Sequence, residues 1–169
     1  MSNSAITANS EIDVENENIA NENIANENVV LDKLPQAALI AAIVAFVGNL
    51  IILNIGRAFG AGFEVMMPGT TALQALPIWP TLILVSVAAA AAGAIALMLL
   101  ANNDSVTKPI TVFGIVGLVI FLLSLYGPYN SATDGSSTVT GLMIMHGWTA
   151  LTVVGMISTV ARQTTDESA

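Results

Sequence analysis

The stretch from Pro80 to Leu100, PTLILVSVAAAAAGAIALMLL, decides the fold because it contains no charged residue. A helix needs about 20 predominantly apolar residues to cross the hydrocarbon core of a bilayer, and this stretch supplies them. It opens just after Trp79, whose indole ring suits the interface between lipid and water. We therefore predict a membrane-spanning helix over residues 80–100.

Three further stretches are similarly apolar and extend the same prediction in both directions along the chain. They cover residues 34–55, 109–126 and 139–160. Pro35 and Pro109 suit the first turns of two of these helices, where a missing N–H group is tolerated. The sequence thus predicts an all-α polytopic membrane protein, with a four-transmembrane-helix bundle over residues 34–162 and a short C-terminal tail over residues 163–169.

The composition supports a membrane class and excludes others. Hydrophobic residues make up 54% of the 169 residues and charged residues only 9%, whereas soluble domains carry about 25% charged residues. The four cations are too few for a nucleic-acid-binding surface, so we expect no nucleic-acid partner. The chain has no cysteine and one histidine, so we also predict no metal and no cofactor.

The net charge of −8 comes largely from residues 1–33. This segment has no aromatic residue and repeats an Asn-Glu-Asn pentapeptide three times, over residues 16–20, 21–25 and 26–30. The period of five fits neither a helix face nor a strand face, and the segment buries too little apolar surface to offset its ordering entropy. We predict a disordered acidic N-terminal tail rather than a signal peptide, with docking to a basic partner as the alternative.

The positions of the cations predict the orientation in the membrane. With four spans, Lys33, Lys108 and Arg162 lie on one side and Arg57 on the other. The positive-inside rule places the three cations in the cytoplasm. We therefore expect a cell-membrane protein with cytoplasmic N- and C-termini.

Small residues follow one another at helical spacing in three of the four predicted spans. The first span has Ala41, Ala45 and Gly48, the second has Ala89 and Gly93, and the third has Gly114 and Gly117. Helices in lipid associate through such small residues, because apolar side chains gain nothing by leaving apolar lipid. A packed bundle is therefore expected rather than four separate anchors.

Polar side chains at membrane depth predict where a site could form. Asn49 and His146 each lie about seven residues inside the outer ends of their spans, and Ser124 lies one turn inside the outer end of the third. These three residues predict an outer-half polar patch, with Arg57 above it. His146 could carry a proton, bind a metal or ligate a haem. The plainer interpretation is an interhelical hydrogen bond to Asn49 or to a backbone carbonyl.

The connection between the first two spans carries the remaining candidate features. Arg57 could bind an anionic headgroup or pair with Glu64, or simply extend its side chain to the interface. Residues 59–79 are long for a turn and contain several apolar residues. We expect a short amphipathic element lying in the interface, which could cap the outer mouth of the bundle.

These residues also carry a resemblance to a known family. Asn49-Leu50 with Gly56-Arg57, Ser124-Leu125 with Pro128, and Met145-His146 resemble a family of uncharacterised four-helix bacterial integral membrane proteins, which is known as a domain of unknown function. The resemblance covers residues 36–160. It implies the four-span architecture and importance for Asn49, Arg57, Ser124 and His146, but it implies no activity.

Three classes of function follow from these features. The first is a non-catalytic accessory or structural subunit of a membrane complex, or a homo-oligomer, because chemically active groups are few. The second is a lipid or small-ligand binding or transport component that uses the polar patch. The third is an enzyme with His146 as general base, which we disfavour because no acidic residue lies within any predicted span.

Overall fold

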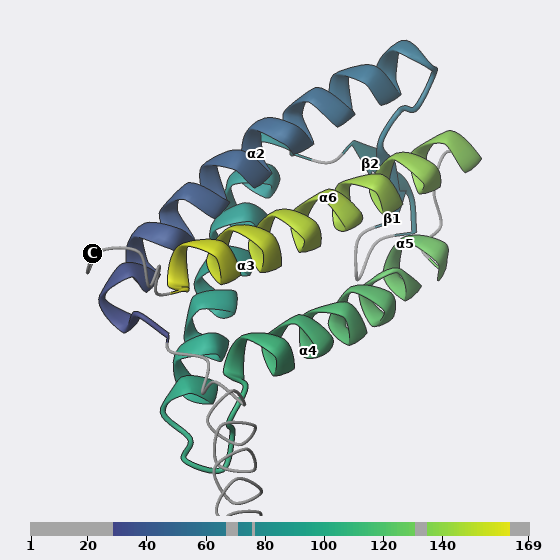
Figure 1. Cartoon of the computed structure of the whole chain (residues 1–169). Coiled ribbons are helices and arrows are strands. Elements are labelled where there is room, and N and C mark those ends of the chain that lie inside the picture. Colours follow the sequence, from purple (N-terminus) through teal and green to yellow (C-terminus); the bar gives the residue numbers. More distant parts are fainter. Residues whose placement is uncertain (1–28, 67–70, 76, 131–134, 163–169) are drawn as a thin grey trace, which may run out of the picture.

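A computed structural model describes residues 29–66, 71–75, 77–130 and 135–162. The described residues fold into four long helices and several short elements (Figure 1). The long helices are α2 (Leu34–Ala58), α3 (Ile78–Ala101), α4 (Pro109–Ser124) and α6 (Ser136–Ala161). The short elements are η1 (Leu31–Lys33), β1 (Glu64–Met66), β2 (Leu73–Ala75) and α5 (Tyr126–Asn130). The prediction of four helices is confirmed, and each is long and apolar enough to cross a membrane, counting α5 as a continuation of α4.

The helices pack so that α2 and α4 both contact α3 and α6. One end of the bundle carries the β1–β2 connection and α5, and we name it the hairpin end (Figure 1). The other end carries η1, the α3–α4 loop and the last turn of α6, and we name it the terminal end. At this end the segment before α2 is hydrogen-bonded to the last residue of α6, because the Val30 N–H donates to the Ala161 carbonyl at 2.9 Å.

Described residues that precede the predicted boundary at Lys33 already contact the bundle. Val29 forms an isolated bridge with Arg162, and residues 31–33 form the 3-10 helix η1. Part of the segment predicted as tail therefore packs on the bundle. The acidic repeats over residues 16–28 lie outside the described residues, as does the predicted C-terminal tail over 163–169.

The α2–α6 interface is built around a glycine. The indole ring of Trp148 occupies the space where a Cβ atom would stand at Gly48, and the ring N–H donates to the Val44 carbonyl at 3.3 Å. One residue further on, the Asn49 amide donates to the Thr149 hydroxyl at 2.8 Å. A small residue thus allows close approach, and polar side chains fix the register of the two helices.

The buried core differs between the two halves of the bundle. In the terminal half all four helices contribute, and α4 supplies Ile110 and Phe113. In the hairpin half the core cluster consists of Leu53, Ala61, Phe63, Leu82 and Met145, with no residue from α4. After Phe113, α4 therefore no longer contributes to the buried core, and this departure creates the cavity described below.

The connection after α2 departs from the single amphipathic element expected for residues 59–79. A Schellman motif ends α2, in which the Ala61 N–H bonds the Gly56 carbonyl and the Gly60 N–H bonds the Arg57 carbonyl, both at 3.0 Å. Gly60 has a φ of 86°, which glycine adopts without strain. The chain then forms an antiparallel hairpin in which Val65 pairs with Gln74.

Candidate functional site

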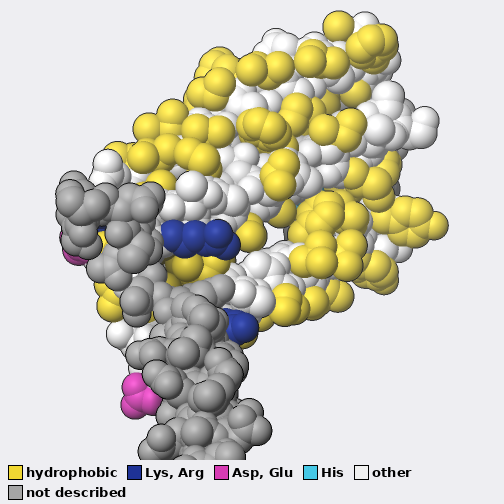
Figure 2. Space-filling model, in the orientation of Figure 1, with side chains coloured by type: hydrophobic (Ala, Val, Ile, Leu, Met, Phe, Trp, Pro, Cys, Tyr) yellow, Lys and Arg dark blue, Asp and Glu magenta, His cyan; other side chains and the backbone are white. Residues whose placement is uncertain are grey.

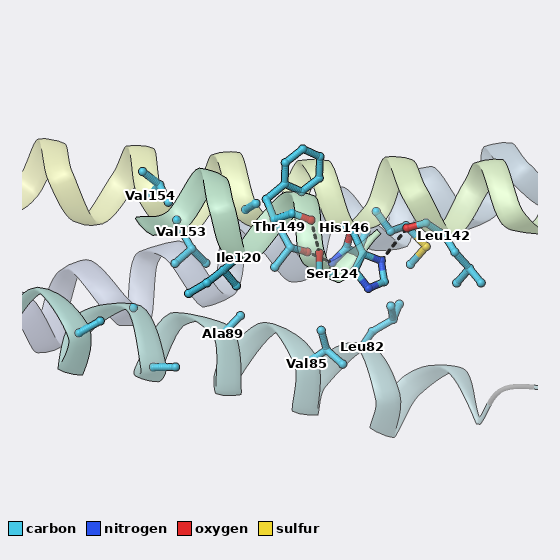
Figure 3. A pocket seen from close by; sticks show the side chains of 18 of the residues that line it. Leu82, Val85, Ala89, Ile120, Ser124, Leu142, His146, Thr149, Val153 and Val154 are labelled. Atoms are coloured by element: carbon cyan, nitrogen blue, oxygen red, sulfur yellow. Dashed lines mark hydrogen bonds between the residues drawn. The ribbon is translucent and has the colours of Figure 1, made fainter. Parts of the chain in front are cut away.

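A cavity of about 380 Å³ lies between α3, α4 and α6 in the described part of the chain. Asn49 and Leu53 of α2 and the side chain of Phe63 complete its wall. Most lining side chains are apolar, among them Val85, Ala89, Val153 and Val154, which Figure 3 shows on facing helices. The volume falls in the range of small-molecule sites, about 300–1,000 Å³.

The cavity is not sealed inside the bundle, because some of its lining side chains on α3 and α4 are exposed. They include Val85 on α3 at 46%, Val116 on α4 at 40% and Ile120 on α4 at 61%. These side chains are all aliphatic. An apolar molecule outside the bundle would therefore reach the cavity across apolar surface only.

Polar side chains gather in the part of the cavity nearer the hairpin end. Asn49, Ser124 and His146 all line it, so the structure brings together three of the four residues singled out from the sequence. The Ser124 hydroxyl donates to the Phe121 carbonyl of its own helix at 2.7 Å. Asn49 is 2% exposed, and beyond its bond to Thr149 its Oδ1 atom has no hydrogen-bond partner among the described residues.

His146 is held by its own helix. Its Nδ1 atom lies 2.8 Å from the Leu142 carbonyl oxygen, and Figure 3 shows the ring directed from α6 toward Leu82 and Val85 of α3. The expected bond was interhelical, to Asn49 or to a backbone carbonyl, whereas the observed partner is a carbonyl of the same helix, α6. Because a carbonyl only accepts, Nδ1 carries the hydrogen, and Nε2 of the neutral ring is then an acceptor.

Arg57 does not belong to this site. It lies exposed in the last turn of α2 and does not line the cavity. Glu64, its possible partner, is exposed in β1. The placement favours the plain interpretation of Arg57 as a surface cation at the helix end.

Phe63 is a cavity residue that sequence reasoning missed. Its backbone has a φ of 56°, a left-handed conformation that is unfavourable for a bulky residue, yet its side chain is only 1% exposed. The ring fits against Gly56 and Gly141, where an added Cβ would lie 2.8 and 2.9 Å from ring carbons. The Phe63 N–H donates to the Thr138 hydroxyl at 3.1 Å. In the sequence, only the absence of side chains at Gly56 and Gly141 could have indicated that a large ring packs there.

The comparison with known families bears directly on the resemblance noted from the sequence. A family model described as a family of unknown function, DUF6069, matches residues 30–163. The chain belongs to this family. The match confirms the resemblance, and no curated protein and no solved structure gives a significant match. The described residues of this DUF6069 chain contain no group of three His, Asp or Glu side chains that could hold a metal ion.

Proposed function

We propose that the four long helices cross a membrane and that the cavity binds an uncharged, largely apolar molecule taken from the bilayer. The single observation that carries the binding proposal is the 380 Å³ apolar cavity, which has exposed lining residues on α3 and α4. Protein interiors are otherwise packed with few voids larger than a water molecule. At roughly 30 Å³ per water-sized group, the cavity has room for about a dozen heavy atoms.

The surface supports the membrane part of the proposal. Apolar side chains cover most of the face in Figure 2, and the Lys and Arg side chains visible there gather near the terminal end. An exposed apolar area of this extent is unfavourable in water but suits lipid. Because Lys33, Lys108 and Arg162 lie at the terminal end, we propose that this end faces the cytoplasm of a cell membrane.

The topology is tested with single cysteines, since the natural chain has none. Gln74 in β2 and Asn103 in the α3–α4 loop are both exposed, at opposite ends of α3. We expect a membrane-impermeant maleimide to label Gln74→Cys in intact cells and to label Asn103→Cys only after permeabilisation. The reverse pattern would invert the orientation, and labelling of both sites in intact cells would contradict a membrane-crossing α3.

Ligand binding is tested with an alkane that carries a photoreactive diazirine, added to the purified protein in phospholipid nanodiscs. We expect mass spectrometry to find adducts concentrated on cavity-lining residues. Ala89 is a half-buried lining residue of α3, so Ala89→Leu narrows the cavity and should reduce these adducts several-fold. The expectation follows because the three added carbon atoms take up space and apolar contacts that the probe would otherwise use.

The neighbouring residue provides a matched control on the same helix. Ala88 is exposed and does not line the cavity, so Ala88→Leu should leave the cavity adducts unchanged. A different result would contradict a binding site. If adducts are spread evenly over the exposed apolar side chains of α3 and α4 and do not differ between the two variants, the probe only covers the protein surface as a lipid does.

The other functional hypotheses remain predictions. An accessory or structural subunit, or a homo-oligomer, is compatible with the exposed faces of α3 and α4, but no particular contact in the described residues favours a protein over lipid there. An enzyme is disfavoured on chemical grounds, because His146 faces aliphatic side chains and no charged residue lines the cavity in the described part of the chain.

A further inference from the structure

Three polar side chains of the cavity each direct a hydrogen-bond donor to the protein itself. The Asn49 amide donates to Thr149, the Ser124 hydroxyl donates to the Phe121 carbonyl, and His146 Nδ1 donates to the Leu142 carbonyl. What these three side chains offer a ligand includes one acceptor each, and the hydroxyls of Thr81 and Thr149 also line the cavity.

Two of the remaining acceptors are well defined. Asn49 Oδ1 is buried without a partner in the described part of the chain, which is costly for a polar group in an apolar setting. His146 Nε2 is an acceptor in the neutral ring, and the bond at Nδ1 fixes the ring that carries it. The Ser124 oxygen can also accept, since only its hydrogen is committed.

The charge of the lining restricts the ligand further. Among the described residues that line the cavity none is Lys, Arg, Asp or Glu. A phosphate or carboxylate would therefore meet acceptors and no cation, and a protonated amine would be buried with no counter-charge, and both are unfavourable. A neutral group with an O–H or N–H bond satisfies the site.

We infer, on the basis of the proposed function, that the ligand is an uncharged amphiphile whose hydroxyl donates a hydrogen bond to His146 Nε2 and whose chain lies along α3. The polar residues lie in the hairpin half of the cavity, whereas Gly93, Phe113 and Val153 form an apolar wall toward the terminal end. The hydroxyl therefore faces the hairpin end, and the chain extends toward Gly93. Long-chain alcohols represent this class.

The inference is tested by competition against the diazirine alkane in nanodiscs, using two isomers of equal size. Decanol has a hydroxyl donor, and nonyl methyl ether has an oxygen that can only accept. We expect decanol to displace the probe at about threefold to tenfold lower membrane concentration, because a net hydrogen bond of ordinary strength corresponds to a ratio of this size. In His146→Leu the two isomers should compete equally, and His146→Gln, which retains an acceptor, should keep part of the preference.

The outcomes separate this inference from the proposed function. Equal competition by the two isomers in the natural protein overturns the donor requirement but leaves the cavity as a binding site. Failure of both isomers to compete, together with the absence of cavity adducts, overturns the proposed function itself. A preference for decanol that persists unchanged in His146→Leu overturns the assignment of the acceptor to His146. The isomer comparison in the natural protein needs no variant, so it stands even where a substitution impairs folding.

Discussion

Replacement of Gly48 by leucine is expected to lower the free energy of unfolding by about 3 kcal/mol or more, at the upper end of the range for overpacked cores. The Trp148 indole already occupies the position of a Cβ atom at Gly48. A leucine must therefore expel the ring, which breaks its hydrogen bond to Val44 and moves Thr149 away from Asn49. Reversible denaturation of the purified protein in mixed micelles, followed by circular dichroism, measures the change.

Gly114 provides a matched control for Gly48. It lies within α4, and an added Cβ there would meet no atom within 4 Å. We expect Gly114→Ala to leave the stability unchanged or to raise it by up to about 1 kcal/mol, because alanine favours a helix more than glycine does. Comparable destabilisation by the two substitutions would show that the loss at Gly48 does not arise from the close α2–α6 contact, because both substitutions raise helix propensity.

The helices could be predicted from the sequence because length and apolarity alone determine them. Charge-free stretches such as residues 80–100 leave few alternatives to a long apolar helix, and α3 extends only slightly beyond them. Depth counting from the helix ends also predicted that Asn49, Ser124 and His146 would meet, since antiparallel neighbours of similar length bring equal depths together. Arg57, which was expected above the patch, lies at the end of α2 and does not line the cavity.

Other features could not be predicted because they depend on packing over long sequence separations. The partner of Asn49 is Thr149 and not His146, which follows from the rotation of α6 about its axis rather than from depth. The cavity exists because the core of the hairpin half contains no residue of α4, whereas the sequence of α4 is apolar throughout. The left-handed Phe63 follows from a turn and two distant glycines, and local sequence preference disfavours it.

Replacement of Phe63 by alanine is the second substitution with a large expected effect, a loss of about 3–5 kcal/mol in the free energy of unfolding. The ring is 1% exposed and fills the space between Gly56 and Gly141 at the hairpin end of the cavity. Removal of the ring leaves a void between α2 and α6. Gly56 and Gly141 cannot fill this void, because glycine has no side chain. Phe59, only a few residues earlier and 82% exposed, is the matched control, and Phe59→Ala should change the stability by less than about 0.5 kcal/mol.

A second variant at the same position tests the backbone conformation separately from the lost ring. At a φ of 56° an alanine retains the strain of a left-handed residue, which costs roughly 1–2 kcal/mol, and a glycine does not. We therefore expect Phe63→Gly to be more stable than Phe63→Ala by about 1 kcal/mol, although glycine ordinarily destabilises a folded chain. The opposite order would show that Phe63 adopts an ordinary backbone conformation in the folded protein. Since the ring of Phe63 also lines the cavity, both variants should enlarge the hairpin end, and the diazirine probe should then label Gly141 and its neighbours.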